Sequence, residues 1–164
     1  MGVVQQKRSK IVSAEEAVRN IPNNSTVTIG GLISILCPEK ALIALEDRFL
    51  KTGEPKNLTV VTPVRVGWDP QNSTGLEHVA HPGMLKRLIS GSFNVKEGPK
   101  LTDMIRNNEI EAYNFSMGTI FHLIRSIAGG HPGYLTKAGL NTYVDPRYDG
   151  GRLNEATKEN VVDL

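Results

Sequence analysis

The chain has 164 residues, the length of one ordinary domain and enough to bury a sizeable hydrophobic core. Hydrophobic residues make up 39% and charged residues 22%, a composition that is typical of folded globular proteins and argues against general disorder. The formal net charge is only +2, and the one dense basic run is Lys7, Arg8 and Lys10, so a nucleic-acid binder is not indicated.

Cysteine use and hydropathy suggest the compartment. The single cysteine, Cys37, rules out an internal disulfide framework and fits a reducing environment. No apolar stretch approaches the roughly 20 residues that a membrane-spanning helix needs, and the amino terminus lacks the apolar core of a signal peptide. We therefore expect a cytoplasmic protein with no membrane partner and no nucleic-acid partner.

The first segments are a tail and a short helix. Residues 1–10 are predicted to be a polar tail, and residues 11–164 to be one domain. Ser13 and Glu16 match a capping box, in which each side chain satisfies a backbone N–H of the other residue, and a short helix through Arg19 should follow.

A strand, a loop and a helix are predicted next. A β-type run begins near Thr26, breaks at Gly30 and Gly31, and is followed by a helix over 38–51 that buries Leu42, Leu45 and Phe49. The glycines either bring a ligand close to the backbone or merely permit a turn. Cys37 just precedes the helix, where a reactive thiolate is conceivable, although a small apolar filler is the favoured interpretation.

The second strand is predicted at Leu58–Thr62. It starts about thirty residues after the first, with one helix between them, which is the length of a βαβ unit and indicates a parallel sheet. Residues 63–82 are irregular and read as a functional or mobile loop. Residues 83–89 are predicted to form a short helix, and 99–107 another.

A second strand, loop and helix follow. Ala112–Phe115 is predicted to be a strand, and the apolar residues from Ile120 to Ile127 predict a helix that is well buried because it is apolar nearly all round. In a parallel sheet, the loop at Gly118 lies on the same rim as the loop at Gly30, so the two are expected to share one pocket. Residues 141–144 are a candidate strand, and no final element is predicted to close the sheet.

The sequence contains partial matches to several chemical motifs. His78 and His81 are spaced as zinc ligands sometimes are, but no third ligand follows at a suitable spacing, so solvated or helix-capping histidines are favoured and no metal is expected. The loop at Gly30 lacks a nucleotide fingerprint, because Ser34 and Ile35 stand where further glycines are needed. No G-x-S-x-G motif marks a serine nucleophile.

Four stretches of the chain resemble the amino-terminal segment of family I CoA-transferases. The similarity runs from about Lys10 to the end and is strongest to the single-chain acetate and propionate (short-chain acyl) CoA-transferases. The stretches are GEPKNLTVVTP (53–63), GLEHVAHPGMLKRLISGSF (75–93), EAYNFSMGTIFHLIR (111–125) and GLNTYVDPRYDGGRLNEATKE (139–159).

The resemblance implies a fold and a chemistry. The fold class is α/β, an open three-layer α/β/α domain with a mainly parallel sheet, incomplete at its C-terminal end and truncated relative to the family. The reaction is a ping-pong transfer of CoA between short-chain carboxylates, in which a glutamate attacks the acyl-CoA and a glutamyl-CoA thioester forms. No cofactor is expected, since CoA and acyl-CoA are substrates.

The nucleophilic glutamate belongs to the second half of family members, and neither Glu97 nor Glu111 stands in its setting. No catalytic residue is therefore assigned, and the chain alone is expected to be inactive. The expected partners are an acyl-CoA, a small carboxylate, and either a β-type half that carries the nucleophile or a second copy of the chain.

By resemblance, the substrate or CoA site is expected at Gly30, Gly31, Asn114, Met117 and Gly118. Relatives usually carry glutamine at the position of Met117, and methionine has no N–H to stabilise the developing oxyanion. Asn114 has the alternative role of capping the next helix. A non-catalytic remnant that binds acyl-CoA or a protein, and a sugar-phosphate isomerase of related fold, are the alternative functions.

Overall fold

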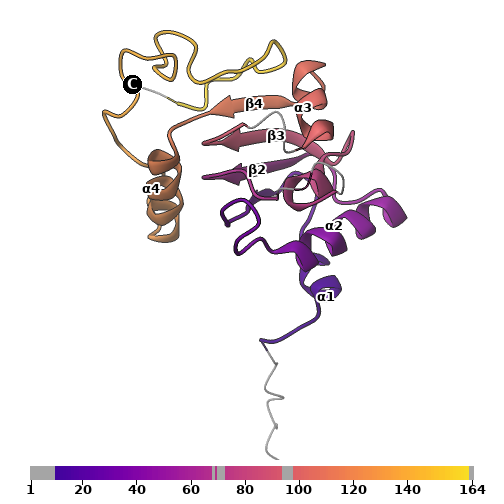
Figure 1. Ribbon diagram of the computed structural model, residues 1–164. Helices are drawn as coiled ribbons and strands as arrows, with labels where there is room; N and C mark the ends of the chain where they lie inside the picture. The colour runs from indigo at the N-terminus through magenta and orange to yellow at the C-terminus, as the bar shows by residue number, and fades with distance from the viewer. Residues whose placement is uncertain (1–9, 68, 70–72, 94–97, 163–164) are drawn as a thin grey trace, which may run out of the picture.

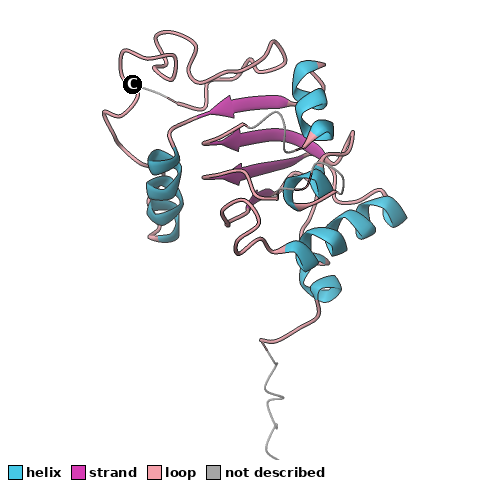
Figure 2. Cartoon of the chain, viewed as in Figure 1, coloured by secondary structure: helices cyan, strands magenta, loops and turns pink. Residues whose placement is uncertain are grey.

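In a computed structural model, residues 10–67, 69, 73–93 and 98–162 of the chain are described. They form a four-stranded sheet in the order β1-β2-β3-β4, in which every neighbouring pair is parallel. The strands are β1 (Thr26–Thr28), β2 (Leu58–Thr62), β3 (Leu85–Ser90) and β4 (Glu111–Asn114). The helices are α1 (Ala14–Val18), α2 (Glu39–Thr52), the 3-10 helix η1 (Gly75–Val79), α3 (Pro99–Arg106) and α4 (Met117–Ala128) (Figures 1 and 2).

The larger core lies on one face of the sheet. Strand residues Leu58, Val60 and Leu88 are all at most 1% exposed and pack in one cluster with α1, α2, η1 and α3. The helical members of that cluster are Val18, Leu42, Ala44, Leu45, Leu76, Val79, Leu101 and Met104. These helices therefore form one layer on this face of the sheet.

The opposite face carries a smaller cluster. Side chains alternate along a strand, so Val61 and Tyr113 point away from the larger core and pack with Phe115 and with Ile120 of α4. Two β1 residues that share this face by alternation, Thr26 and Thr28, are exposed. Helices thus flank both faces, and the predicted α/β class is confirmed, but the second layer covers only part of the sheet.

Most of the predicted elements are confirmed. The Ser13 Oγ atom accepts the Glu16 N–H at 3.2 Å and caps α1, which is the Ser13 half of the predicted capping box. Helix α2 buries Leu42 and Leu45 at 3% and 2% exposure. The predicted strand at 58–62 and the helix and strand near 99–115 also occur, within one or two residues of their expected ends.

The helix predicted for residues 83–89 is wrong, because most of that segment is β3. Leu85, Leu88 and Ile89 have helical spacing, but β3 lies between β2 and β4 and is covered on both faces, so its residues need not alternate between apolar and polar. A short apolar run in such a strand cannot be distinguished from a buried helix by its period.

Two further expectations are corrected. Helix α4 is not well buried, because Ile120 is its one buried residue while Phe121 and Ile127 are 56% and 57% exposed. The strand expected at 141–144 is absent from the described chain, which turns there instead. The buried Asp145 carboxylate accepts the Asn141 N–H at 2.8 Å and also binds Arg147, which closes the turn.

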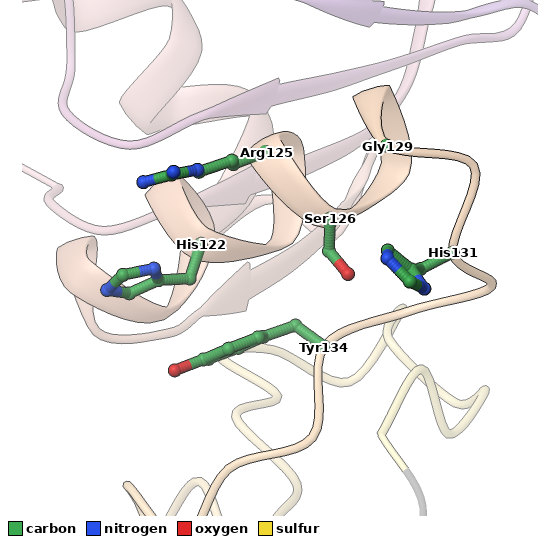
Figure 3. A pocket seen from close by; sticks show the side chains of 6 residues that line it. All are labelled: His122, Arg125, Ser126, Gly129, His131 and Tyr134. Atoms are coloured by element: carbon green, nitrogen blue, oxygen red, sulfur yellow. The ribbon is translucent and has the colours of Figure 1, made fainter.

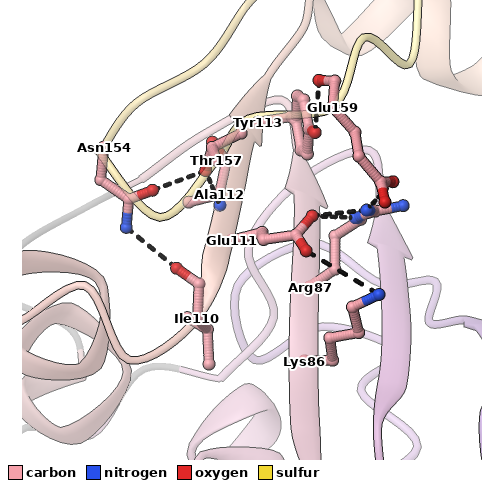
Figure 4. A network of polar contacts seen from close by, with 9 residues as sticks. All are labelled: Lys86, Arg87, Ile110, Glu111, Ala112, Tyr113, Asn154, Thr157 and Glu159. Atoms are coloured by element: carbon pink, nitrogen blue, oxygen red, sulfur yellow. Dashed lines mark hydrogen bonds and ion pairs between the residues drawn. The ribbon is translucent and has the colours of Figure 1, made fainter.

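The C-terminal segment covers the outer edge of β4 (Figure 4). Leu153 N–H donates to the Ala112 carbonyl at 3.0 Å, and Ala112 N–H donates to the Thr157 hydroxyl at 2.7 Å. The Tyr113 hydroxyl donates to the Glu159 carbonyl at 2.7 Å. The edge that would otherwise offer unpaired backbone groups is therefore occupied by irregular chain.

Replacing Thr157 with valine is expected to lower the free energy of unfolding by about 1–3 kcal/mol, because the buried Ala112 N–H loses its acceptor. Urea denaturation followed by circular dichroism measures the change. Thr26→Val is the matched control, since the Thr26 side chain is exposed on β1. Equal stability of the two variants would contradict the assigned role of the Thr157 hydroxyl.

None of the described helices is long and apolar enough to cross a membrane. The predicted tail at 1–10 lies outside the described residues except for Lys10, and the cytoplasmic location stays a prediction.

Candidate functional site

All four strands end at one rim of the sheet because they run parallel. After β1 the chain turns at Gly30 and Gly31, and after β4 it passes Ser116 into α4. The prediction that the two loops share a rim is therefore confirmed. They follow the two edge strands, which three strand spacings separate by about 14 Å, so a common pocket for an extended ligand stays a prediction.

The loops along this rim hold one another through backbone contacts. Ile33 N–H donates to the Arg65 carbonyl at 3.3 Å, and Gly67 N–H donates to the Ile33 carbonyl at 2.6 Å. Arg65 N–H donates to the Ser92 hydroxyl at 3.3 Å. The loops after β1, β2 and β3 therefore form one continuous surface.

Close packing requires glycine at two rim positions. Gly31 has a φ of 146°, and a Cβ atom there would lie 2.6 Å from Val66 Cγ1. A Cβ atom on Gly91 would lie 2.2 Å from the Pro63 carbonyl oxygen and 2.9 Å from Met117 Cα. At Gly91 the loop after β3 therefore packs closely against the start of α4.

Gly30 and Gly118 face open space instead. No described atom lies within 4 Å of a Cβ atom built on either residue, so internal packing does not explain these glycines. Gly118 is in the first turn of α4, whose N-terminus is capped by the Ser116 hydroxyl accepting the Thr119 N–H at 3.2 Å. Met117, the first residue of α4, is 45% exposed. A ligand can approach the positive end of this helix.

Asn114 is the last residue of β4, and its side chain has two partners within the chain. Its side-chain N–H donates to the Ser90 carbonyl at 3.0 Å, and its side-chain oxygen accepts the Tyr143 hydroxyl. The alternative that Asn114 caps α4 is wrong, because Ser116 does so. Asn114 thus links the ends of β3 and β4 to the C-terminal segment, and whether it also contacts a substrate stays a prediction.

A buried ion pair joins Arg65, in the loop after β2, to Glu77 of η1. The Arg65 and Glu77 side chains are 6% and 4% exposed, with Nη2 and Oε1 2.9 Å apart. Glu77 also accepts the backbone N–H of Lys100 at 3.0 Å and of Leu101 at 3.3 Å, in the first turn of α3. The Arg65 backbone makes hydrogen bonds to the loops after β1 and β3, and Glu77 binds the first turn of α3. The ion pair therefore links the rim to α3.

The two histidines tested as metal ligands are buried or half-buried, and the expectation that they are solvated or capping is wrong. His78 Nδ1 lies 2.5 Å from Glu46 and Nε2 lies 2.8 Å from Glu39, while His81 Nε2 lies 2.6 Å from Glu46. Burial raises the pKa of each glutamate, but the hydrogen bonds, including those from the imidazoles, outweigh it and lower the pKa overall. The cluster joins α2 to η1. Among the described residues, no group of three potential ligands could hold a metal ion.

Cys37 is not activated as a nucleophile. Burial, followed by the hydrogen bond to Glu39 and its charge, raises the pKa of the thiol to about 12. The Sγ and Glu39 carboxylate oxygen atoms are 3.2 Å apart. The thiol therefore stays protonated at neutral pH, which favours the interpretation of Cys37 as a packing residue.

Alkylation of Cys37 by iodoacetamide at pH 8 is expected to be about a hundredfold slower in the folded chain than in urea, because the raised pKa removes the thiolate. Mass spectrometry of quenched samples gives both rates. Glu39→Gln is expected to accelerate the folded-state reaction by removing the neighbouring charge. Equal rates in the folded and unfolded chains would contradict the assignment.

Comparison with known proteins adds the family. The sequence profile of the family described as Coenzyme A transferase matches residues 11–162. The chain belongs to the coenzyme A transferase family. The resemblance identified from the motifs is confirmed, and the parallel sheet with flanking helices is the fold of solved coenzyme A transferases.

Two members of the coenzyme A transferase family, one of them with a solved structure, illustrate the match. The acetate CoA-transferase YdiF of Escherichia coli O157:H7 is 34% identical over 158 residues, which are 96% of this chain and 29% of that protein. Its crystal structure, a thioester complex with CoA, superposes with a TM-score of 0.80 over 93% of this chain. The alpha subunit of an acetoacetyl-CoA:acetate/butyrate CoA transferase from Clostridium acetobutylicum is 28% identical over 137 residues, 84% of this chain and 58% of that subunit. The chain therefore spans less than a third of the length of YdiF.

For a coenzyme A transferase, the position of the acidic residues is informative. Glu111 is the first residue of β4 and lies at the rim opposite Gly30 and Gly118, where it binds Arg87. Glu97 lies outside the described residues. Glu111 therefore does not lie at the rim where the strands end.

Some residues of the rim were not found from the sequence. Arg65 and Glu77 fall in the segment 63–82 that was expected to be an irregular loop, and Tyr143 falls in the expected strand. Their pairing depends on tertiary contacts. The one available signal was a charged residue flanked by apolar ones, as in Val64-Arg65-Val66, which a buried ion pair explains better than a surface loop does.

Proposed function

We propose that this chain is the N-terminal part, or α-type portion, of a short-chain acyl-CoA:carboxylate CoA-transferase. It forms one wall of the active site, with Gly30, Gly31, Asn114, Met117 and Gly118 facing the acyl-CoA. The observation that carries the proposal is that parallel strands bring the loop at Gly30 and the start of α4 to one rim.

The nucleophile is supplied by a second half. A glutamate carboxylate attacks the acyl carbonyl, CoA leaves as the thiolate, and the anhydride forms; the thiolate then attacks the glutamyl carbonyl, which releases the carboxylate and leaves glutamyl-CoA. A second carboxylate reverses these steps. The thioester is thereby exchanged without hydrolysis and without a cofactor.

The half-covered face of the sheet is where we place this second half. Besides the exposed Thr26 and Thr28, the apolar side chains of Phe121 and Ile127 on α4 are more than half exposed. Ile35 and Leu36 in the loop after β1 are 64% and 87% exposed. A face of this kind marks a protein interaction surface. The name of the clostridial relative, an alpha subunit, also supports a partner subunit.

The test is an assay of CoA transfer from acetyl-CoA to propionate or acetoacetate. The chain alone is expected to give no turnover, and addition of a β-type polypeptide is expected to restore it. Mass spectrometry should find the glutamyl-CoA adduct on the partner. Turnover by the isolated chain, with the adduct on one of its own glutamates, would refute the assignment of the nucleophile to a second half.

A non-catalytic acyl-CoA-binding or protein-binding remnant is the second candidate, and the thioether of Met117 favours it because it offers no N–H to an oxyanion. Calorimetric titration with CoA and a pull-down separate the two functions. A remnant binds a ligand or a protein, but no partner restores transfer.

A further inference from the structure

A pocket of about 350 Å³ lies beside the C-terminal half of α4, between that helix and the segment after it (Figure 3). It is lined by His122, Arg125, Ser126, Gly129, His131 and Tyr134. The four residues at 122–129 recur at intervals of three and four, so they share one face of the helix and its end. None of these residues belongs to the strand-end rim.

The walls of the pocket are held in place by contacts of their own. The Ser126 hydroxyl donates to the Gly133 carbonyl at 2.5 Å and fixes the segment after the helix. The Tyr134 ring stacks on the His122 ring, with centroids 5.1 Å apart and planes inclined by 20°. Helix α4 and the segment after it thus contact each other at two points around the pocket.

The lining is rich in hydrogen-bond donors. Arg125 carries a permanent positive charge, and the rings of His122 and His131 bring further N–H donors. None of the lining residues is acidic. Within the described part of the chain, no hydrogen bond or ion pair engages the Arg125 guanidinium or a nitrogen atom of either ring.

Cations near a helix C-terminus commonly compensate its free carbonyl groups. Here the backbone does so. The carbonyl oxygens of Arg125, Ser126 and Ile127 accept N–H groups from residues 129–131 at 2.9–3.1 Å. The donors of Arg125 and of the two imidazole rings therefore remain available for a ligand.

We propose that this pocket binds a phosphate group, through the Arg125 guanidinium and the ring N–H groups of His122 and His131. A planar guanidinium matches two phosphate oxygens, and the two imidazoles, one on α4 and one on the segment after it, add N–H donors along the same pocket. A single carboxylate offers fewer acceptors for three donors.

Two sources share this chemistry: free inorganic phosphate and the phosphate groups of CoA. The second source rests on the proposed function. Residues 122–129 lie about 8–18 Å along α4 from Met117, at about 1.5 Å per residue. An extended ligand can thus place a reacting group near Met117 and a phosphate in the pocket.

The experiment uses the histidine rings as reporters, since the chain has only four. Inorganic phosphate is titrated at constant pH and ionic strength while proton–carbon NMR spectra of the rings are recorded. The signals of His122 and His131 are expected to shift. Those of His78 and His81, held by Glu39 and Glu46, are expected to stay in place and serve as internal controls.

Arg125→Gln is expected to raise the dissociation constant for phosphate about tenfold or more, because a charge-assisted contact is lost. Arg106→Gln removes the same charge from an exposed position in the last turn of α3 and should leave binding unchanged. Absent shifts, equal shifts of all four rings, or an Arg125→Gln variant that titrates like the unchanged chain would each overturn the proposal.

The source is assigned by comparing CoA with pantetheine, which lacks the phosphates. Weaker binding of CoA by Arg125→Gln, with pantetheine unaffected, supports the pocket and assigns it to CoA. Loss of phosphate binding with CoA unaffected supports the pocket for free phosphate. Both readouts are independent of transfer, so a failed transferase assay leaves the test of the pocket intact.

Discussion

Changing Met117 to glutamine is expected to raise the turnover number of the assembled transferase by about a hundredfold, the effect typical of one oxyanion donor. Met117 is the first residue of α4, its backbone packs on Gly91, and its side chain is 45% exposed at the rim. A glutamine amide at this position adds an N–H beside the positive end of the helix. Because the contact strengthens as charge develops, KM should change little.

Met117→Leu is the matched control, because leucine keeps the apolar character and the approximate size of methionine without adding a donor. It should leave turnover unchanged, and unfolding curves should show equal stability for all three proteins. A glutamine variant that turns over no faster than the leucine variant would remove Met117 from the proposed oxyanion site, and the non-catalytic function would then be favoured.

Replacing Glu77 with glutamine is expected to lower the free energy of unfolding by about 3–5 kcal/mol, the range for breaking a buried ion pair by neutralising one partner. The Glu77 carboxylate lies 2.9 Å from Arg65 Nη2 and accepts two N–H groups in the first turn of α3. The neutral amide keeps the shape of the side chain but removes the negative charge that faces the Arg65 guanidinium. Denaturant unfolding at pH 7 measures the loss.

Glu109→Gln serves as the control, since Glu109 is exposed and, among the described residues, its carboxylate binds only the Asn107 side chain. Its effect should stay within about 0.5 kcal/mol. In a double-mutant cycle, Arg65→Met should cost less in the Glu77→Gln background than alone. Additive effects would show that the ion pair is not the source of the stability.

The fold was predictable where local signals agree with the tertiary structure. The glycine pair after β1, the proline before α2 and the β-branched run at Leu58–Thr62 each indicate the element that forms. The segment Leu85–Ser90 misleads because a strand buried on both faces has no fixed period. The exposure of Phe121 could not be predicted, since an apolar helix looks the same whether its cover comes from the same chain or another.

The candidate site shows the same division. Glycines at 30 and 118 and the parallel direction of the strands, inferred from the βαβ spacing, place two loops on one rim without any knowledge of contacts. The role of Asn114 was not predictable, because its amide is bound by Tyr143 from a distant segment. The His78 environment was missed for the same reason, since both of its acidic neighbours come from α2.

The occupied edge of β4 determines how this sheet can grow. Residues 151–157 already use the free backbone groups there, so a strand contributed by another polypeptide has to join beside β1. Such an addition would make β1 an interior strand of a wider sheet instead of an edge strand. The glycine pair would then sit where strand order reverses direction, the location at which open α/β sheets form their ligand crevice.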